Sequence, residues 1–329
     1  MAVSHAFSPK EFQVWIIAET TAGTSAIHKD NMYQLDVDSA SMPSLNVNQV
    51  LDVRSGVGRT LKDEDFFQDN ILRATELSIS GNMHLDAGHK LLLQNICNDV
   101  SGDASIATGF VPASQLYGSS IENIASSLTV VIKSSDHSNQ RSLEMSGMVV
   151  TNFVLSADAG EEGGRYKFSA TLQSGVKPDL NESSVSAGSN VYANTTNIFM
   201  SSASGLKVFN TDVVMQSFSA TIDSPAVFSG VTSTGYELVS RGAETAVTVD
   251  TQIKYDGNTK GFINSFDTQT APLSGNMFVM TNNNAYGIDV QNGVFTNVAY
   301  AEADIMMLDC SIKAVDDGAD ALITFDISS

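Results

Sequence analysis

The chain has 329 residues, a length that predicts about two domains, and only 16% of its residues are charged. Ser, Thr, Asn and Gly are frequent whereas Lys, Arg and Glu are scarce, and this composition favours strands and turns over helical bundles. The 37 acidic and 17 basic side chains give a formal net charge of −20, which opposes tight binding to nucleic-acid phosphate or to an anionic membrane. A soluble protein from a salty environment can also be this acidic without a dedicated role.

The sequence contains no recognisable targeting segment. Its first 20 residues lack the basic start and the apolar core of roughly 7 to 15 residues that define a secretory signal. No apolar run approaches the roughly 20 residues of a membrane-spanning helix. Cys97 and Cys310 each lie in an apolar pattern and are expected to be small buried side chains, not a disulfide. We therefore expect a protein that is made in a cytosol, or that belongs to something assembled there.

Strands are expected at several places in the first half of the chain. Residues 75–85 alternate apolar and polar side chains, which predicts a strand with one buried face. Two shorter strands are expected before it, over residues 32–39 and 44–50. Two further alternating strands are expected after it, over residues 142–157 and 165–172.

Residues 86–96 (DAGHKLLLQNI) have the spacing of a short helix. Asp86 suits the N-cap, because its carboxylate can accept hydrogen bonds from the free amides of the first turn. Leu92, Leu93 and Ile96 fall on one face of a 3.6-residue period, so this face is expected to be buried.

The second half of the chain repeats this pattern. Residues 245–255 match residues 75–85 at an offset of 170, and residues 256–266 (DGNTKGFINSF) repeat the helix at the same offset and without a gap. Beyond the helix the offset is 145, since residues 287–302 match residues 142–157 and align two Thr-Asn pairs. Chance similarity between generic β patterns is the alternative explanation. The shared register of strand and capped helix favours an internal duplication.

The two offsets differ by 170 − 145 = 25 residues, which predicts an insertion in the first copy. We place it in the Gly- and Ser-rich residues 101–120, as a surface loop. The second copy is expected to open with strands over residues 206–209 and 217–223 and to close with one over residues 307–315. Residues 176–204 are polar and have no sustained period, so a long linker or decorated loop is expected there.

These elements predict a mainly β protein with two tandem domains, each containing one short α-helix. The expected organisation is an N-terminal arm over residues 1–30, a first β domain over 31–175, a polar linker over 176–204 and a second β domain over 205–329. Each domain is long enough to bury a core of its own.

Little in the sequence points to catalysis. No phosphate-binding loop, dinucleotide fingerprint or Gly-x-Ser-x-Gly elbow occurs. His84 and His89 are the closest pair of histidines, but they flank a strand-to-helix turn and lack the spacing of metal ligands. Residues 98–105 and 315–321 resemble fragments of calcium loops, although turn formation explains them without a metal. We therefore expect no enzyme, cofactor or metal site; a carboxylate pair that forms only in the fold stays open.

The order of a strand pair, a long loop, a strand, a helix and further strands, written twice, resembles the tail tube proteins of long-tailed bacteriophages. The likeness is closest to the two-domain members, and it includes residues 12–24 (FQVWIIAETTAGT), residues 217–244 and the strand-helix unit after them. The resemblance implies tube-type β-sandwich or barrel domains whose sheets join into the closed inner barrel of a ring. Single-domain relatives build six-fold rings, so a tandem chain would form trimeric rings with pseudo-six-fold symmetry, which stack into a hollow tube.

The resemblance also implies which residues make contacts between rings. The loops that reach the adjacent ring correspond to residues 51–72 and 223–245, and both carry aromatic and arginine side chains of the kind that anchor interfaces. These residues are Arg54, Arg59, Phe66, Phe67, Phe228, Tyr236 and Arg241. As an alternative, Phe66 and Phe67 cover the core of their own domain. Glu144 and Asp289, which the offset of 145 matches, are expected to be acidic positions in the lumen or between the domains.

The expected function is that of a structural virion protein, the major tail tube subunit, which assembles with itself in the host cytoplasm and resides in the virion tail. Its acidic lumen would repel the viral DNA in transit, and tape-measure, terminator and distal tail proteins are the expected neighbours, with no membrane partner. The alternative is a two-domain β-sandwich protein of the virion that binds carbohydrate or a receptor. The single tryptophan, Trp15, argues weakly against this alternative, because sugar sites usually stack on aromatic rings. An enzyme ranks third.

Overall fold

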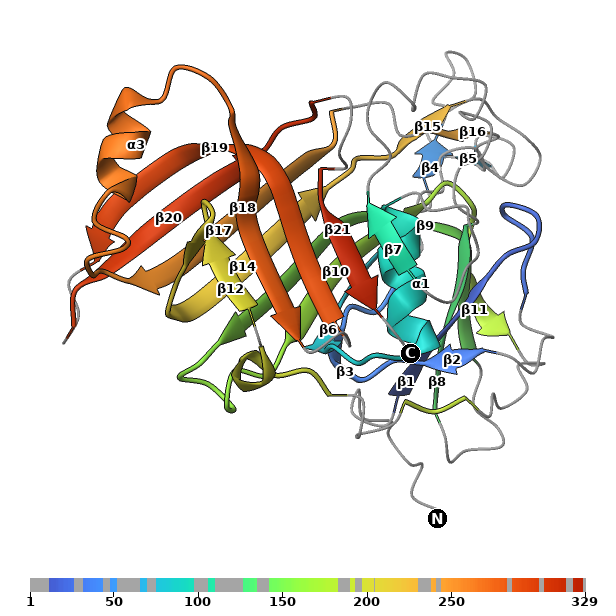
Figure 1. Cartoon of the computed structure of the whole chain (residues 1–329). Helices are drawn as coiled ribbons and strands as arrows, with labels where there is room; N and C mark the ends of the chain where they lie inside the picture. Colours follow the sequence, from blue (N-terminus) through green and yellow to red (C-terminus); the bar gives the residue numbers. More distant parts are fainter. Residues whose placement is uncertain are drawn as a thin grey trace.

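The computed structural model has the mainly β fold that the sequence predicts. It comprises one antiparallel sheet of 17 strands and two separate two-stranded sheets (Figure 1). The structure describes residues 12–26, 32–43, 48–51, 66–69, 75–97, 106–109, 127–134, 142–182, 190–192, 197–203, 205–229, 238–240, 244–282, 286–301, 305–317 and 322–327.

The elements of the first half of the chain begin with a buried strand. Residues 12–18, which lie within the predicted N-terminal arm, form this strand, β1. The elements are β1 (Phe12–Ala18), β2 (Tyr33–Gln34), β3 (Val37–Ala40), β4 (Asn48–Leu51), β5 (Phe66–Asp69), β6 (Thr75–Asn82), α1 (Ala87–Ile96), β7 (Ile106–Gly109), β8 (Leu128–Ser134), β9 (Ser142–Asp158), β10 (Lys167–Ser174) and β11 (Asp179–Glu182).

The second half follows after a short 3-10 helix, η4 (Met200–Ser202). Its elements are β12 (Gly205–Val208), β13 (Thr211–Asp212), β14 (Met215–Asp223), β15 (Val227–Ser229), β16 (Leu238–Ser240), β17 (Ala246–Lys254), α3 (Phe262–Thr268), β18 (Leu273–Asn282), β19 (Tyr286–Ala301), β20 (Met307–Ala314) and β21 (Thr324–Ile327). Neither α1 nor α3, the α-helices of the described residues, is long and apolar enough to cross a membrane.

The two halves of the chain follow the same order of strand pairing. In the first half, neighbouring strands follow the order β3–β6–β10–β9–β8–β1, and in the second half they follow the order β14–β17–β20–β19–β18–β12. The long strand of each half changes partners along its length: β9 pairs first with β8 and then with β10, and β19 pairs first with β18 and then with β20. We call these two sets of elements the first and the second repeat.

Two β-bulges fix how the repeats align. Thr151 of β9 and Thr296 of β19 are each an extra residue opposite the neighbouring strand. Each hydroxyl donates a hydrogen bond of 3.2 Å across that strand pair, to the carbonyl oxygen of Thr171 or Ser311. The second bulge lies between Val37 and Ser39 in β3 and between Met215 and Ser217 in β14. A bulge is a local feature of one position, so its recurrence marks equivalent residues.

The gapless match between the strand-helix units is wrong by two residues. The bulges place Ser78 of β6 opposite Thr171, and Asp250 of β17 opposite Ser311, so these strands correspond at an offset of 172 and not 170. Side chains on a strand alternate with a period of two, so a shift of two residues leaves the apolar pattern unchanged. The sequence pattern alone therefore could not reveal the shift.

The first helix forms as predicted, whereas the second begins later. Asp86 caps α1, and its carboxylate accepts a hydrogen bond of 2.9 Å from the amide of His89. Asp256 instead accepts hydrogen bonds from the amides of Asn258 and Thr259 in a turn, and α3 begins at Phe262. Asp and Thr side chains bond readily to nearby backbone groups, and here that local bonding replaces the first turn of the predicted helix.

Two segments expected to lack regular structure contain strands. Within the predicted surface loop of residues 101–120, β7 pairs with β21 of the second repeat. Within the predicted linker of residues 176–204, β11 pairs with β9, in the place that β21 occupies on β19. Short strands such as these take their stability from the edge they cover, so their own sequence carries a weak signal.

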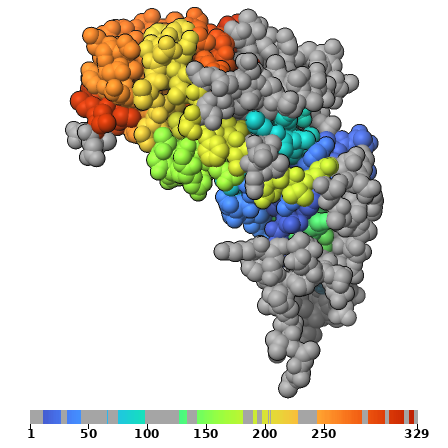
Figure 2. Space-filling model, turned by 60° about the horizontal axis from the view of Figure 1, so that its bottom comes forward, coloured from blue at the N-terminus to red at the C-terminus, as the bar shows by residue number. Residues whose placement is uncertain are grey.

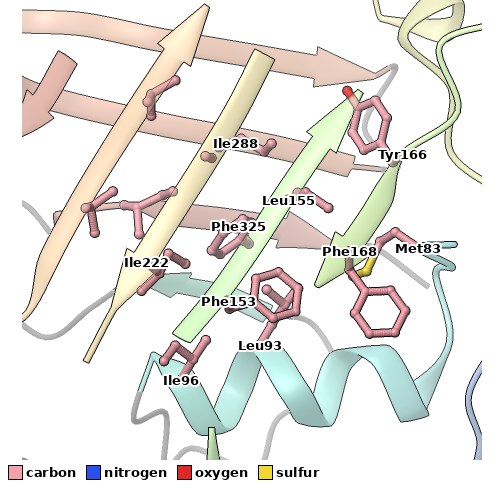
Figure 3. Packing of buried hydrophobic residues seen from close by; sticks show 14 of the residues in the cluster. Met83, Leu93, Ile96, Phe153, Leu155, Tyr166, Phe168, Ile222, Ile288 and Phe325 are labelled. Atoms are coloured by element: carbon pink, nitrogen blue, oxygen red, sulfur yellow. The ribbon is translucent and has the colours of Figure 1, made fainter. Parts of the chain in front are cut away.

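One hydrophobic core joins the two repeats. Phe153 and Leu155 of β9 lie beside Ile222 of β14 and Phe325 of β21, with Leu93 of α1 beneath them (Figure 3). All five side chains are fully buried. Cys97 and Cys310 are free and buried, as predicted for small apolar side chains.

Candidate functional site: the sheet edges that could join copies of the chain

The two repeats join along one pair of strand edges, which we call the seam. Residues 152–158 of β9 pair with residues 217–223 of β14 on one edge, and residues 152–156 pair with β10 on the other. At one end of the seam, the amide of Ser224 donates a 2.8 Å hydrogen bond to the carbonyl of Thr151. At the other end, the amide of Ala159 donates a 2.8 Å hydrogen bond to the carbonyl of Gln216.

Among the residues that the structure describes, the strand edges that correspond to the seam have no partner strand at either end of this strand order. β3 corresponds to β14, but among the described residues it pairs with β6 alone. Residues 297–301 of β19 correspond to residues 152–156 of the seam, and the described strands pair them with β20 on one edge and with no strand on the other. We call these the β3 edge and the β19 edge. An open edge presents unpaired backbone N–H and C=O groups, which can pair with another chain.

Each open edge carries an exposed apolar side chain where the seam has a buried one. The bulges align β3 with β14 at an offset of 178, so Met42 corresponds to Ala220. They align β19 with β9 at 296 − 151 = 145, so Tyr300 corresponds to Leu155. Ala220 and Leu155 face each other in the seam and are fully buried, whereas Met42 is 42% exposed and Tyr300 is 54% exposed. The open edges thus keep the apolar character of the seam without its cover.

The two helices also differ in burial: α1 of the first repeat is buried more completely than α3 of the second repeat. α1 packs against β9, β1 and β2 of its own repeat, and its Leu92, Leu93 and Ile96 are fully buried. α3 packs against β19, and of its residues only Phe262 is buried while Ile263 and Phe266 are half-buried. Figure 2 shows the orange surface around residues 255–270 at one end of the molecule. An apolar helix face without full cover favours a further partner.

The predicted ring-contact residues are only partly described. Phe66 and Phe67 lie in β5, which pairs with β4, and Phe228 lies in β15, which pairs with β16. Phe66 is 48% exposed in the single chain. Figure 1 draws both two-stranded sheets at the same end of the molecule. Arg54, Arg59, Tyr236 and Arg241 lie outside the described residues.

The two matched acidic residues occupy equivalent positions. Glu144 pairs with Val131 of β8 and Asp179 of β11, and Asp289 pairs with Val279 of β18 and Thr324 of β21. Glu144 is buried between its two neighbouring strands and Asp289 is half-buried. In the single chain, therefore, the Glu144 side chain does not lie on an open surface.

A buried carboxylate, missed at the sequence level, ties three segments together. Glu19 follows β1, and one of its oxygens accepts hydrogen bonds from the amide of Gly23 at 2.7 Å and the hydroxyl of Ser127 at 2.5 Å. The other accepts from the hydroxyl of Thr129 at 2.7 Å and the amide of Gly147 at 2.8 Å. These donors come from three separate parts of the chain, so no sequence spacing announces them. A charged residue directly after the apolar strand FQVWIIA was the available signal.

His84 and His89 lie in a buried polar cluster. Their ring centroids are 5.2 Å apart, and each ring contacts a carboxylate at 2.8 Å: His84 contacts Asp36 and His89 contacts Asp86. Arg165 adds a guanidinium nitrogen 3.4 Å from the Asp36 carboxylate. No group of three or more His, Cys, Asp or Glu side chains that could hold a metal ion occurs among the described residues.

This cluster predicts a loss of stability in mild acid. Burial, as the largest cause, and the nearby His89 lower the pKa of His84 from 6.5, although the Asp36 carboxylate opposes the shift. The unfolded chain therefore binds more protons than the native one below about pH 6.5, and the free energy of unfolding falls as the pH falls through this range. We expect the Tm to drop between pH 7.5 and 5.5, and to drop less in the His84→Gln variant. An equal drop in both proteins would show that another group is responsible.

Neither the protein-family models nor the curated proteins compared with this chain gave a match.

Proposed function

We propose that this protein is a structural subunit that assembles with itself, and specifically the major tail tube subunit of a virion. The observation that carries the proposal is the tandem repeat: two copies of one β unit joined by a seam, with the matching open edges left at the two ends. Different edges on one subunit form heterologous contacts, which build rings when the rotation between subunits closes. Closure also removes the open edges, which are aggregation hazards in a monomer.

In this proposal each chain fills two of six positions, so three chains complete a ring with pseudo-six-fold symmetry. The rings stack into a hollow tube, and the exposed Phe66 on β5 suits a contact between rings. The net charge of −20 supports a conduit that does not adhere to passing DNA. The chain itself carries out no catalysis. Tape-measure, terminator and distal tail proteins are its proposed neighbours, and assembly takes place in the host cytoplasm.

One observation favours the alternative, a carbohydrate- or receptor-binding protein. A pocket of about 320 Å³ lies beside the start of α1, and its lining includes Tyr33, Asp86, Asn190 and Tyr192. Aromatic rings next to amide and carboxylate groups are the side chains that sugar sites use. Such a protein would stay small and would bind its ligand in a saturable manner.

Electron microscopy of the purified protein over a concentration series separates these proposals. We expect rings, or hollow tubes with a regular axial repeat, above a threshold concentration, because every open edge is then paired. Sedimentation at the same concentrations should show the single chain give way to much larger species. Small discrete particles at every concentration would contradict the tube subunit and favour the binding protein.

A further inference from the structure

We propose that copies of this chain join head to tail by repeating the seam: the β3 edge of one copy pairs with the β19 edge of the next, and Met42 lies opposite Tyr300. This inference rests on the proposed function, because it presumes that the chain assembles with itself. It adds the partner surfaces, their polarity and their register.

The register follows from the pairing inside the chain. In the seam Ala220 lies opposite Leu155 and Ser219 lies opposite Ser156. The bulges fix the offsets at 178 for β3 and 145 for β19, so Ala220 corresponds to Met42 and Leu155 corresponds to Tyr300. By the same offsets, the residues that correspond to Ser219 and Ser156 are Ser41 and Ala301.

The backbone of the β3 edge is oriented for this pairing. The amide of Ser41 donates a 2.8 Å hydrogen bond to the carbonyl of Ser78 on β6. Backbone groups alternate in direction along a strand, so those of Ala40 and Met42 point away from β6, toward the open side. Pro43, which has no N–H to donate, falls on the same side as Ser41 and therefore takes no donor from the new contact.

Burial of apolar surface supports the same contact. Met42 and Tyr300 are exposed in the single chain, and their seam counterparts are fully buried. α1 is buried against β9, β1 and β2 of its own repeat, whereas α3 packs against β19 and leaves Ile263 and Phe266 half-buried. A second copy placed as in the seam would cover Met42 and Tyr300 and would bring further apolar surface close to α3. Two different edges on each copy allow one polarity only, so the chains add in one direction and can close into a ring.

Cysteine pairs test the register directly. Ser41 and Ala301 are predicted neighbours in a pair without direct backbone hydrogen bonds, where Cα atoms lie about 4.5 Å apart, within reach of a disulfide. The assembled Ser41→Cys/Ala301→Cys protein should give a covalent species of three chains on mild oxidation. Ser41→Cys/Ala299→Cys shifts the pair by two residues and should give at least tenfold less. Cys97 and Cys310 are buried and do not compete.

A charge placed on the proposed contact gives a second test. Met42→Asp should raise the threshold concentration for assembly at least tenfold, because a carboxylate would be buried against Tyr300. Val214→Asp is the matched control, since Val214 is apolar and 62% exposed but lies on neither open edge, and its threshold should stay unchanged. The Tm of both variants below the threshold should stay near that of the unmodified chain.

The outcomes separate this inference from the proposed function. Rings or tubes that form normally with Met42→Asp and without cross-links at Ser41 and Ala301 would overturn the seam-like contact and leave the tube subunit standing. Cross-linked ladders of chains that pass beyond three would support the contact but overturn closure at three. A protein that stays monomeric at every concentration would remove both proposals.

Discussion

Glu19→Gln is expected to lower the free energy of unfolding by about 3 kcal/mol. The Glu19 side chain is buried, and each of its two oxygens accepts two hydrogen bonds from Gly23, Ser127, Thr129 and Gly147. A glutamine keeps one acceptor oxygen and turns an NH2 group toward the other two donors. The hydroxyl of Ser127 or Thr129 can rotate and accept from this NH2 group, but the backbone amide of Gly23 or Gly147 is left without its acceptor, and the bonds to a charged oxygen are lost. Urea unfolding below the assembly threshold, monitored by Trp15 fluorescence, measures the effect.

Glu161→Gln is the matched control for this experiment. Glu161 lies in the turn after β9, its side chain is 69% exposed, and its contact is Lys167 at 3.4 Å. Exposed ion pairs contribute little, so this variant should change stability by less than about 0.5 kcal/mol. A Glu19→Gln effect no larger than that of Glu161→Gln would show that the buried network contributes little beyond what water supplies.

Alternation of apolar and polar side chains predicts the strands that have one buried face, but it does not detect strands that are buried on both faces. β6, β9, β17 and β19 all lie where the pattern places them, within a residue or a few at the ends. The alternation does not predict β8. Val130, Val131 and Ile132 of this strand are all fully buried, so its sequence is a continuous apolar run. Such a run carries no period to detect.

The candidate assembly site could not be predicted from the sequence. The sequence already gives the offset of 145 that matches Tyr300 to Leu155, but the offset of 178 that matches Met42 to Ala220, and so the proposed pair, depends on the bulges in β3 and β14. A bulge inserts one residue and leaves no reliable mark in a composition of Thr, Asn and Ser. The sequence could predict the duplication, because a repeated strand-helix unit is a long pattern, but which edges stay open is a property of the whole sheet.

The repeated helix provides the second prediction, a comparison between equivalent helix residues. The helices match at an offset of 170, so Leu93 of α1 corresponds to Ile263 of α3. Leu93 is fully buried beneath the seam, and Leu93→Ala should lower the free energy of unfolding by about 3 kcal/mol through lost contacts and a cavity. Ile263 is half-buried, and Ile263→Ala should cost about 1 kcal/mol because water already reaches that side chain. Denaturant unfolding of both variants below the assembly threshold gives the two values.

The same two variants behave differently once the chain assembles, and this difference identifies what covers α3. If a second copy packs over α3, Ile263→Ala removes contacts that form only between chains. Its threshold concentration for assembly should then rise about tenfold, equivalent to about 1.4 kcal/mol, while Leu93→Ala should leave the threshold unchanged in chains that remain folded. Equal costs for both variants in the single chain, with no effect on assembly, would mean that α3 is already as well covered as α1 and that the β19 edge is not a contact between copies.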